Sequence, residues 1–256
     1  MGVLEAHLRA RRDSGSKLLV AYITAGARSD WLELLLGVSQ AGVDGIEVGI
    51  PFSDPVMDGP VIQEACTRAL GCATTLQGIL AELETVNLGV PLIAMSYYNP
   101  ILALGLAETA HGMVKSHLAG SIIPDLSLEE TKPWHKVAHF LGIDTVLLVA
   151  PSTPKQRVKL ICDESSGFVY AVGVMGVTGE RSSLAGEAVQ VVEAIKSFTD
   201  TPVLVGVGVS DAAQAAQVCQ VADGVVVGSA IMRRVLAGES INEIASFVAG
   251  IRQGIA

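Results

Sequence analysis

Short runs of branched apolar residues recur eight times along this chain of 256 residues, separated by segments with helical spacing. A run that is apolar at every position indicates a strand buried on both faces, as in a parallel sheet. The runs that we interpret as strands are residues 18–24, 45–50, 91–98, 121–126, 145–150, 168–173, 202–209 and 224–231.

Between these runs, apolar residues recur every three or four positions, which is typical of helices packed on a sheet. Such segments are residues 31–41, 76–86, 129–141, 154–164, 186–198 and 211–221. Strand and helix alternating eight times over the chain predict a closed (β/α)8 barrel, the TIM barrel of the α/β class. A flavodoxin-like or Rossmann sheet has fewer strands and would leave some runs unassigned. We therefore expect residues 1–256 to form a single barrel domain.

Two further helices are expected outside this repeat. Residues 3–12 are placed to close the N-terminal end of the barrel, and residues 61–70 form an extra helix after the second strand. The loop 51–60 precedes that extra helix and follows a strand. It should therefore lie at the C-terminal end of the barrel, where enzymes of this fold build their active sites.

Composition excludes several classes of protein. The net charge is −9 and basic residues are not clustered, so we expect no nucleic-acid partner. No apolar run reaches the ~18 residues of a membrane span, and the first residues lack the apolar stretch of a secretion signal. The four cysteines form no C-x-x-C pair, which is typical of free thiols in a reducing compartment. We expect a cytoplasmic protein with no membrane partner.

Glu47 lies in the middle of the second apolar run, Gly45-Ile46-Glu47-Val48-Gly49-Ile50. Side chains alternate along a strand, so Glu47 shares one face with two glycines while the branched residues share the other. A lone buried acid is costly unless it is paired, protonated or used. Glu47 is therefore either a catalytic acid or a structural acid that holds loops together.

Other aspartates after the strands have a structural and a functional interpretation. Asp58 precedes Gly59-Pro60 and a helix, so it is either an N-terminal cap or a second acid of a site. Asp54 is typical of a turn, and for Asp125 we favour a role in holding a loop. The five histidines fall in segments that we expect to be helical, and none has the spacing of a metal site.

Glycines gather after the seventh and eighth strands. Gly206-Val207-Gly208 and Gly228-Ser229 would let backbone N–H groups approach a ligand closely, and barrels often bind phosphate between these two loops. The alternative is that these glycines only make tight turns. Neutral N–H donors would suit an acidic protein, since no Lys or Arg is needed to bind the anion.

These motifs together resemble one enzyme family. The segment 45–63 is the most specific, and residues 176–179, 206–210, 222–224 and 228–231 follow it in the expected order and spacing. In these motifs the chain resembles the α subunits of tryptophan synthase over essentially its full length. The resemblance implies cleavage of indole-3-glycerol phosphate to indole and glyceraldehyde 3-phosphate, a retro-aldol reaction of tryptophan biosynthesis without metal or organic cofactor.

The resemblance also implies roles for individual residues. It makes Glu47 the general acid–base and Asp58 its acidic partner, with Thr178 on a closing loop that contacts Asp58. Substrate-binding residues would be Tyr22, Ile62, Met95, Tyr97, Tyr170 and Thr178, and phosphate-binding residues would be Gly179, Gly208, Gly228 and Ser229.

The chemistry agrees with these roles. The indole ring leaves only after its C3 is protonated, and a glycerol hydroxyl must lose a proton. One carboxyl group can serve in both steps if burial raises its pKa. A nearby carboxylate can accept the indole N–H bond and stabilise the positive charge that develops there.

Family members pair with a β subunit that holds pyridoxal phosphate, so the resemblance implies an α2β2 complex with the cofactor only in the partner. The loop 51–60 and the segment at Asn99 would face that partner. Tyr22 and Val207 depart from residues common in relatives and would reshape the indole pocket slightly.

Three other functions remain open at this point. A sugar-phosphate epimerase or isomerase would share the phosphate loops, but it should show metal ligands or a Lys base at the strand ends. A partner that only regulates a complex should have lost Glu47 or Asp58. A free-standing lyase that releases indole without a β subunit would keep both acids.

Overall fold

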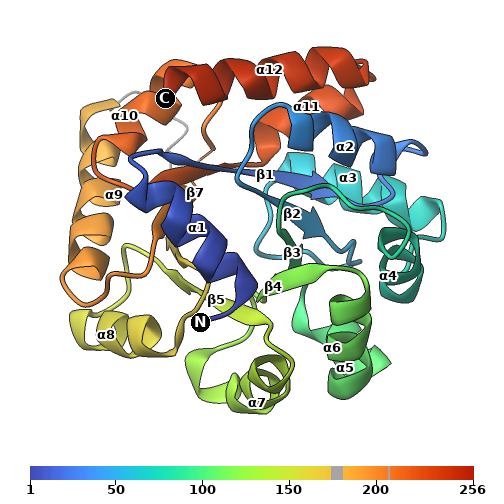
Figure 1. The fold of residues 1–256 in the computed structure, drawn as a ribbon, viewed down its shortest axis with the longest axis horizontal. Helices are drawn as coiled ribbons and strands as arrows, with labels where there is room; N and C mark the ends of the chain where they lie inside the picture. The colour runs from blue at the N-terminus through green and yellow to red at the C-terminus, as the bar shows by residue number, and fades with distance from the viewer. Residues whose placement is uncertain (174–180, 207) are drawn as a thin grey trace.

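Eight parallel strands close into a barrel in a computed structural model that describes residues 1–173, 181–206 and 208–256. Each strand pairs with the next along the chain, and β1 pairs with β8 to close the ring (Figure 1). The predicted fold class is confirmed. The strands are β1 Leu18–Thr24, β2 Gly45–Gly49, β3 Leu92–Met95, β4 Leu118–Ile122, β5 Asp144–Val149, β6 Val169–Val172, β7 Val203–Gly206 and β8 Gly224–Val227.

Helices surround the barrel and include every helix expected from the apolar spacing. These are α1 Val3–Asp13, α2 Trp31–Gln40, α3 Pro60–Gly71, α4 Leu76–Leu83, α7 Lys132–Phe140, α8 Lys155–Glu164, α9 Arg181–Lys196 and α10 Ala212–Cys219. The apolar spacing did not single out α5 Tyr98–Leu104, α6 Leu106–Lys115, α11 Ser229–Leu236 and α12 Ile241–Gly254. His117 lies in a turn with a positive φ of 59° rather than in a helix. Within the described part of the chain, no helix has the length and apolarity needed to cross a membrane.

The fourth strand lies earlier than the sequence predicted, at Leu118–Ile122 instead of 121–126. The apolar pattern did not reveal the start of this strand, because Gly120 interrupts the run of apolar residues. The structure needs glycine there, since a Cβ atom at this position would lie 2.6 Å from a methyl carbon of Leu4. The third and eighth runs were predicted too long, because their apolar character continues into α5 and α11.

Helix α1 closes the N-terminal end of the barrel, as predicted. Its Leu4 and Leu8 are fully buried and belong to the apolar cluster that fills the lower interior. The Asp144 carboxylate fixes the start of α1 by accepting hydrogen bonds from the N–H groups of Gly2 and Glu5, each at 3.1 Å. In Figure 1 the helix crosses in front of the strands.

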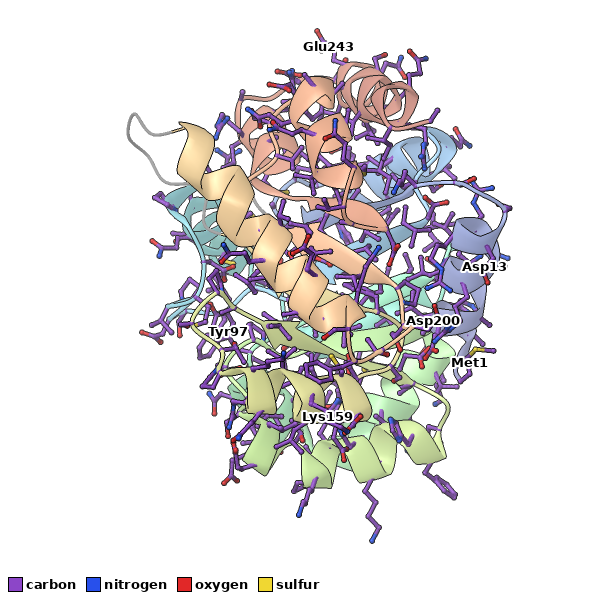
Figure 2. The ribbon with its side chains drawn as sticks, turned by 90° about the vertical axis from the view of Figure 1, so that its left-hand side faces the viewer. Met1, Asp13, Tyr97, Lys159, Asp200 and Glu243 are labelled. Atoms are coloured by element: carbon purple, nitrogen blue, oxygen red, sulfur yellow. The ribbon has the colours of Figure 1, made fainter. Side chains whose placement is uncertain are left out.

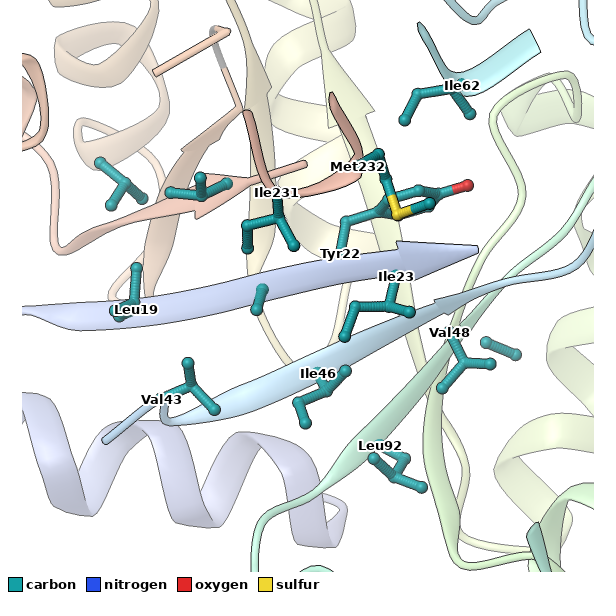
Figure 3. Packing of buried hydrophobic residues seen from close by; sticks show 14 of the residues in the cluster. Leu19, Tyr22, Ile23, Val43, Ile46, Val48, Ile62, Leu92, Ile231 and Met232 are labelled. Atoms are coloured by element: carbon teal, nitrogen blue, oxygen red, sulfur yellow. The ribbon is translucent and has the colours of Figure 1, made fainter. Parts of the chain in front are cut away.

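The two faces of each strand carry different clusters. Leu19 and Ile23 of β1, with Ile46 and Val48 of β2, belong to the large outer cluster between sheet and helices (Figure 3). The alternate residues face the interior, where the lower half is apolar. A ligand can therefore enter only from the C-terminal end, opposite α1.

Replacing Leu8 with Ala should destabilise the protein by about 2–5 kcal/mol, because the truncation leaves a cavity in the interior cluster. Val3→Ala on the same helix is the matched control, since Val3 is 70% exposed and should change stability by less than about 0.5 kcal/mol. Urea unfolding of both variants measures the difference. Equal losses for the two would show that α1 does not close the barrel in solution.

Candidate active site

Glu47 points into the barrel from β2 and is paired in register with Tyr22 on β1 and Ile93 on β3. Its side chain is 1% exposed, and neither carboxyl oxygen has a hydrogen-bond partner among the described residues. Burial raises the pKa of Glu47 from 4.5 to about 8. The side chain is therefore mostly protonated at pH 7, and it forms none of the hydrogen bonds to described residues that an acid holding loops together would make.

Two tyrosines lie near Glu47, and each needs a glycine on the neighbouring strand. A Cβ atom at Gly49 would overlap the Tyr22 hydroxyl, and one at Gly206 would overlap the Tyr170 hydroxyl. Burial raises the pKa of both tyrosines, and the negative charge of Glu47 would raise it further. Both hydroxyls therefore stay protonated at neutral pH, and burial is the cause of the raised pKa of Glu47.

Asp58 reaches the same region from the loop between β2 and α3. Its Oδ2 accepts a hydrogen bond of 2.9 Å from the Tyr97 hydroxyl. Burial raises the pKa of Asp58, and the bond from Tyr97 acts in the opposite direction. The N-cap position of α3 is occupied by Gly59 without a side-chain bond, so the capping alternative for Asp58 does not hold.

A cavity of about 280 Å³ opens at the C-terminal end of the barrel and is lined by both acids. It also brings together most of the other residues predicted for the site, from several strands and loops. These are Tyr22, Ile62, Met95, Tyr170, Gly208, Gly228 and Ser229. Tyr97 does not belong to the described lining, although its hydroxyl is bonded to Asp58.

The end of the cavity at β7 and β8 offers backbone donors. Gly208 has a φ of +48°, a left-handed conformation that favours glycine. Gly228 directly precedes α11, whose first N–H groups have no acceptor within the helix. The positive end of the helix dipole favours an anion at this point. The described lining contains no Lys or Arg, so an anion here would depend on these neutral donors.

Besides Tyr97, four other residues that the sequence analysis considered are not part of the described cavity lining. Thr178 and Gly179 lie outside the residues that the structure describes. Asp125 accepts a 2.9 Å bond from the N–H of Tyr98 and so holds the start of α5, as expected of a loop-holding residue. Asp54 accepts a 2.6 Å bond from the Ser53 hydroxyl within the turn of its own loop.

Several lining residues were missed by the sequence reasoning. Leu148, Val172 and Val226 occupy inward positions near strand ends, and strand alternation counted from known inward neighbours could have found them. Pro124 follows β4, whose end was predicted too late. Among the residues described, no three His, Cys, Asp or Glu side chains are grouped to hold a metal.

Comparison with known proteins gives a consistent result. The family model described as tryptophan synthase alpha chain matches residues 8–252. The tryptophan synthase alpha chain of Prochlorococcus marinus is 41% identical over 238 residues, covering 91% of this chain and 89% of its own length. That of Thermobifida fusca is 39% identical, covering 100% and 98%.

Solved structures agree with the sequence comparison. A ligand-free tryptophan synthase structure from M. tuberculosis superposes with a TM-score of 0.91 at 31% identity, covering 100% of this chain and 99% of that one. The tryptophan synthase alpha subunit of Legionella pneumophila superposes with a TM-score of 0.88 at 29% identity, covering 100% and 98%. The likeness therefore extends over the whole barrel.

The raised pKa of Glu47 predicts how stability depends on pH. Between pH 4.5 and about 8 the folded protein keeps a proton that the unfolded chain releases, so stability should fall as pH rises through this window. The full shift corresponds to a loss of about 5 kcal/mol. Glu47→Gln has no carboxyl group at this position and should not lose stability in this way as the pH rises. The variant should therefore be more stable relative to wild type at pH 8.5 than it is at pH 4.5.

Urea unfolding across this pH range measures the effect. Glu84→Gln, at an exposed side chain, controls for the loss of one acidic group. Parallel stability curves for wild type and Glu47→Gln would contradict the raised pKa.

Proposed function

Since this chain belongs to the tryptophan synthase alpha chain family, we propose that Glu47 and Asp58 perform the family's cleavage of indole-3-glycerol phosphate in the 280 Å³ cavity. The chain is a carbon–carbon lyase of tryptophan biosynthesis, and its products are indole and glyceraldehyde 3-phosphate. The observation that carries the assignment of residues is the buried carboxyl group of Glu47, which has no partner among the described residues and lines the same cavity as a second acid.

Glu47 begins the reaction as a proton donor. It is neutral at pH 7, so it can protonate C3 of the indole ring and leave a positive charge that is shared with the ring nitrogen. The Glu47 carboxylate formed in this step then takes the proton of the glycerol hydroxyl next to the ring. The C–C bond breaks, its electrons return to the ring, and Glu47 is again protonated for the next cycle.

Asp58 stabilises the charge that forms on the indole nitrogen. One oxygen of the Asp58 carboxylate accepts a hydrogen bond from Tyr97. The other oxygen can accept a hydrogen bond from the N–H of a ligand in the cavity. A charge-assisted hydrogen bond of this kind strengthens as the ring becomes cationic, so it lowers the barrier rather than only the binding energy.

The phosphate group of the substrate is placed at the N-terminus of α11. Gly228 and Ser229 line this end of the cavity together with Gly208. Their backbone N–H groups are the donors that we propose for the phosphate oxygens. Thr178 and Gly179 are proposed as further contacts on the basis of the family resemblance alone.

We also propose that the chain works with a partner. The related M. tuberculosis protein is described as tryptophan synthase in an aminoacrylate-bound form. By analogy, we propose an α2β2 complex in which pyridoxal phosphate belongs to the β subunit. The loop 51–60 carries Val56 and Met57, which are 78% and 60% exposed and would be covered by that subunit. The segment at Asn99 is proposed as a second contact.

Glu47→Gln should lower kcat for indole release by at least about a hundredfold, because it removes the transferable proton. Asp58→Asn should also lower kcat by about a hundredfold, since a neutral amide cannot balance the ring charge. In wild type, kcat/KM should fall as pH rises above about 8, where Glu47 loses its proton. Steady-state indole release checks these outcomes, with circular dichroism as the folding control. Full activity of Glu47→Gln would exclude Glu47 as the proton donor.

The partner is tested by assaying indole release with and without a tryptophan synthase β subunit. Slow release alone and a large increase with the β subunit are expected, because covering the exposed Val56 and Met57 should restrict the loop 51–60 to one conformation. Fast release that the β subunit does not change would identify a free-standing lyase. No release in either assay would contradict the proposed reaction.

A further inference from the structure

Tyr97 ties the loop that carries Asp58 to the end of β3. Its hydroxyl donates to Asp58 Oδ2 at 2.9 Å and accepts from the Met57 N–H at 2.9 Å, so one oxygen atom binds two consecutive residues of the loop. The Tyr97 side chain is 5% exposed. Figure 2 shows Tyr97 on the side of the molecule away from Met1 and Asp13. Its partner Asp58 lines the cavity.

Tyr97 is itself held in place from several directions. Its carbonyl accepts a 2.8 Å bond from the Ser96 hydroxyl, and Asp125 holds the next N–H along the chain at 2.9 Å. Its ring stacks on Phe52 with centroids 5.0 Å apart and planes at 26°. A side chain fixed in this way is preorganised to orient another group.

We propose that Tyr97 is a positioning residue for Asp58, which it holds at the cavity with one carboxylate oxygen occupied and the other open to the indole N–H. This inference rests on the proposed role of Asp58 and refines the earlier expectation that Tyr97 binds substrate. Tyr97 donates a hydrogen bond to Asp58 but does not belong to the described cavity lining, so it can orient the carboxylate without lining the space that a ligand would occupy.

The same bond affects the charge of Asp58. Burial raises the pKa of Asp58, and the Tyr97 hydroxyl opposes this by donating to the ionised form. Without the hydroxyl, Asp58 should be protonated up to a higher pH. The other titratable groups that act on this region are Glu47, Tyr22, Tyr170, Cys66 and Asp125.

Tyr97→Phe tests the proposal because it removes only the hydroxyl and keeps the ring on Phe52. We expect kcat to fall about tenfold at pH 7 with KM changed less than about twofold, since a hydrogen bond to a charged group is lost. The acidic limb of the pH–kcat profile should move to higher pH. Tyr98→Phe is the matched control, since Tyr98 packs against the outer cluster, and its activity should equal that of wild type.

A double-mutant cycle with Asp58→Asn separates the roles. If Tyr97 acts through Asp58, the Tyr97→Phe change should cost little further activity once Asp58 is Asn. The inference would be overturned if the activity losses of the two single variants multiplied in the double variant, or if Tyr97→Phe raised KM and left kcat unchanged. Either result would mean that Tyr97 contacts the substrate directly. Full activity of Asp58→Asn alone would instead contradict the proposed function of Asp58. The inference about Tyr97 rests on that function and would then also be wrong.

Discussion

A buried carboxyl group inside a barrel is tolerated as a neutral acid, or as an anion with strong partners, because burial removes most of the water that would stabilise its charge. Glu47 has no such partners in the described structure. Its proton is therefore kept by desolvation, and the rest of the site depends on this. The tyrosines beside it are neutral, and their hydroxyls occupy the space that Gly49 and Gly206 leave. A cation placed near Glu47 would favour its ionisation and remove the proton that Glu47 supplies in the proposed reaction.

The barrel also decides from which side Glu47 can be reached. Leu4 and Leu8 of α1 complete an apolar cluster in the lower interior, so nothing polar can approach from the N-terminal end. The inward side chains above this cluster belong to the cavity. Side chains alternate between the two faces of each of the eight strands. The inward-facing set therefore forms both the apolar cluster at one end of the barrel and the cavity at the other. Apolar packing in the lower interior and in the outer cluster stabilises the barrel, so the upper interior layer can carry an acid that is unfavourable to bury.

The sequence predicted the barrel and the inward direction of Glu47, because both follow from periodicities that short segments carry. It placed β4 wrongly because Gly120 breaks the apolar run, although this glycine is needed for the contact with Leu4. It also could not find the bond between Tyr97 and Asp58, which joins residues 39 positions apart. Local patterns predict elements and faces, whereas a contact between two loops depends on how the finished barrel brings strand ends together.

The two acids illustrate why a site of this kind needs both a strand and a loop. Glu47 is fixed by the sheet and fully desolvated, so it is an acid whose proton is available. Asp58 lies on a loop, and a hydroxyl donor favours its charged form. Burial raises the pKa of both carboxyl groups, but only Asp58 has a hydrogen bond that opposes the shift. The proposed separation of the two roles therefore depends on Tyr97, a residue that is neither charged nor part of the described cavity lining.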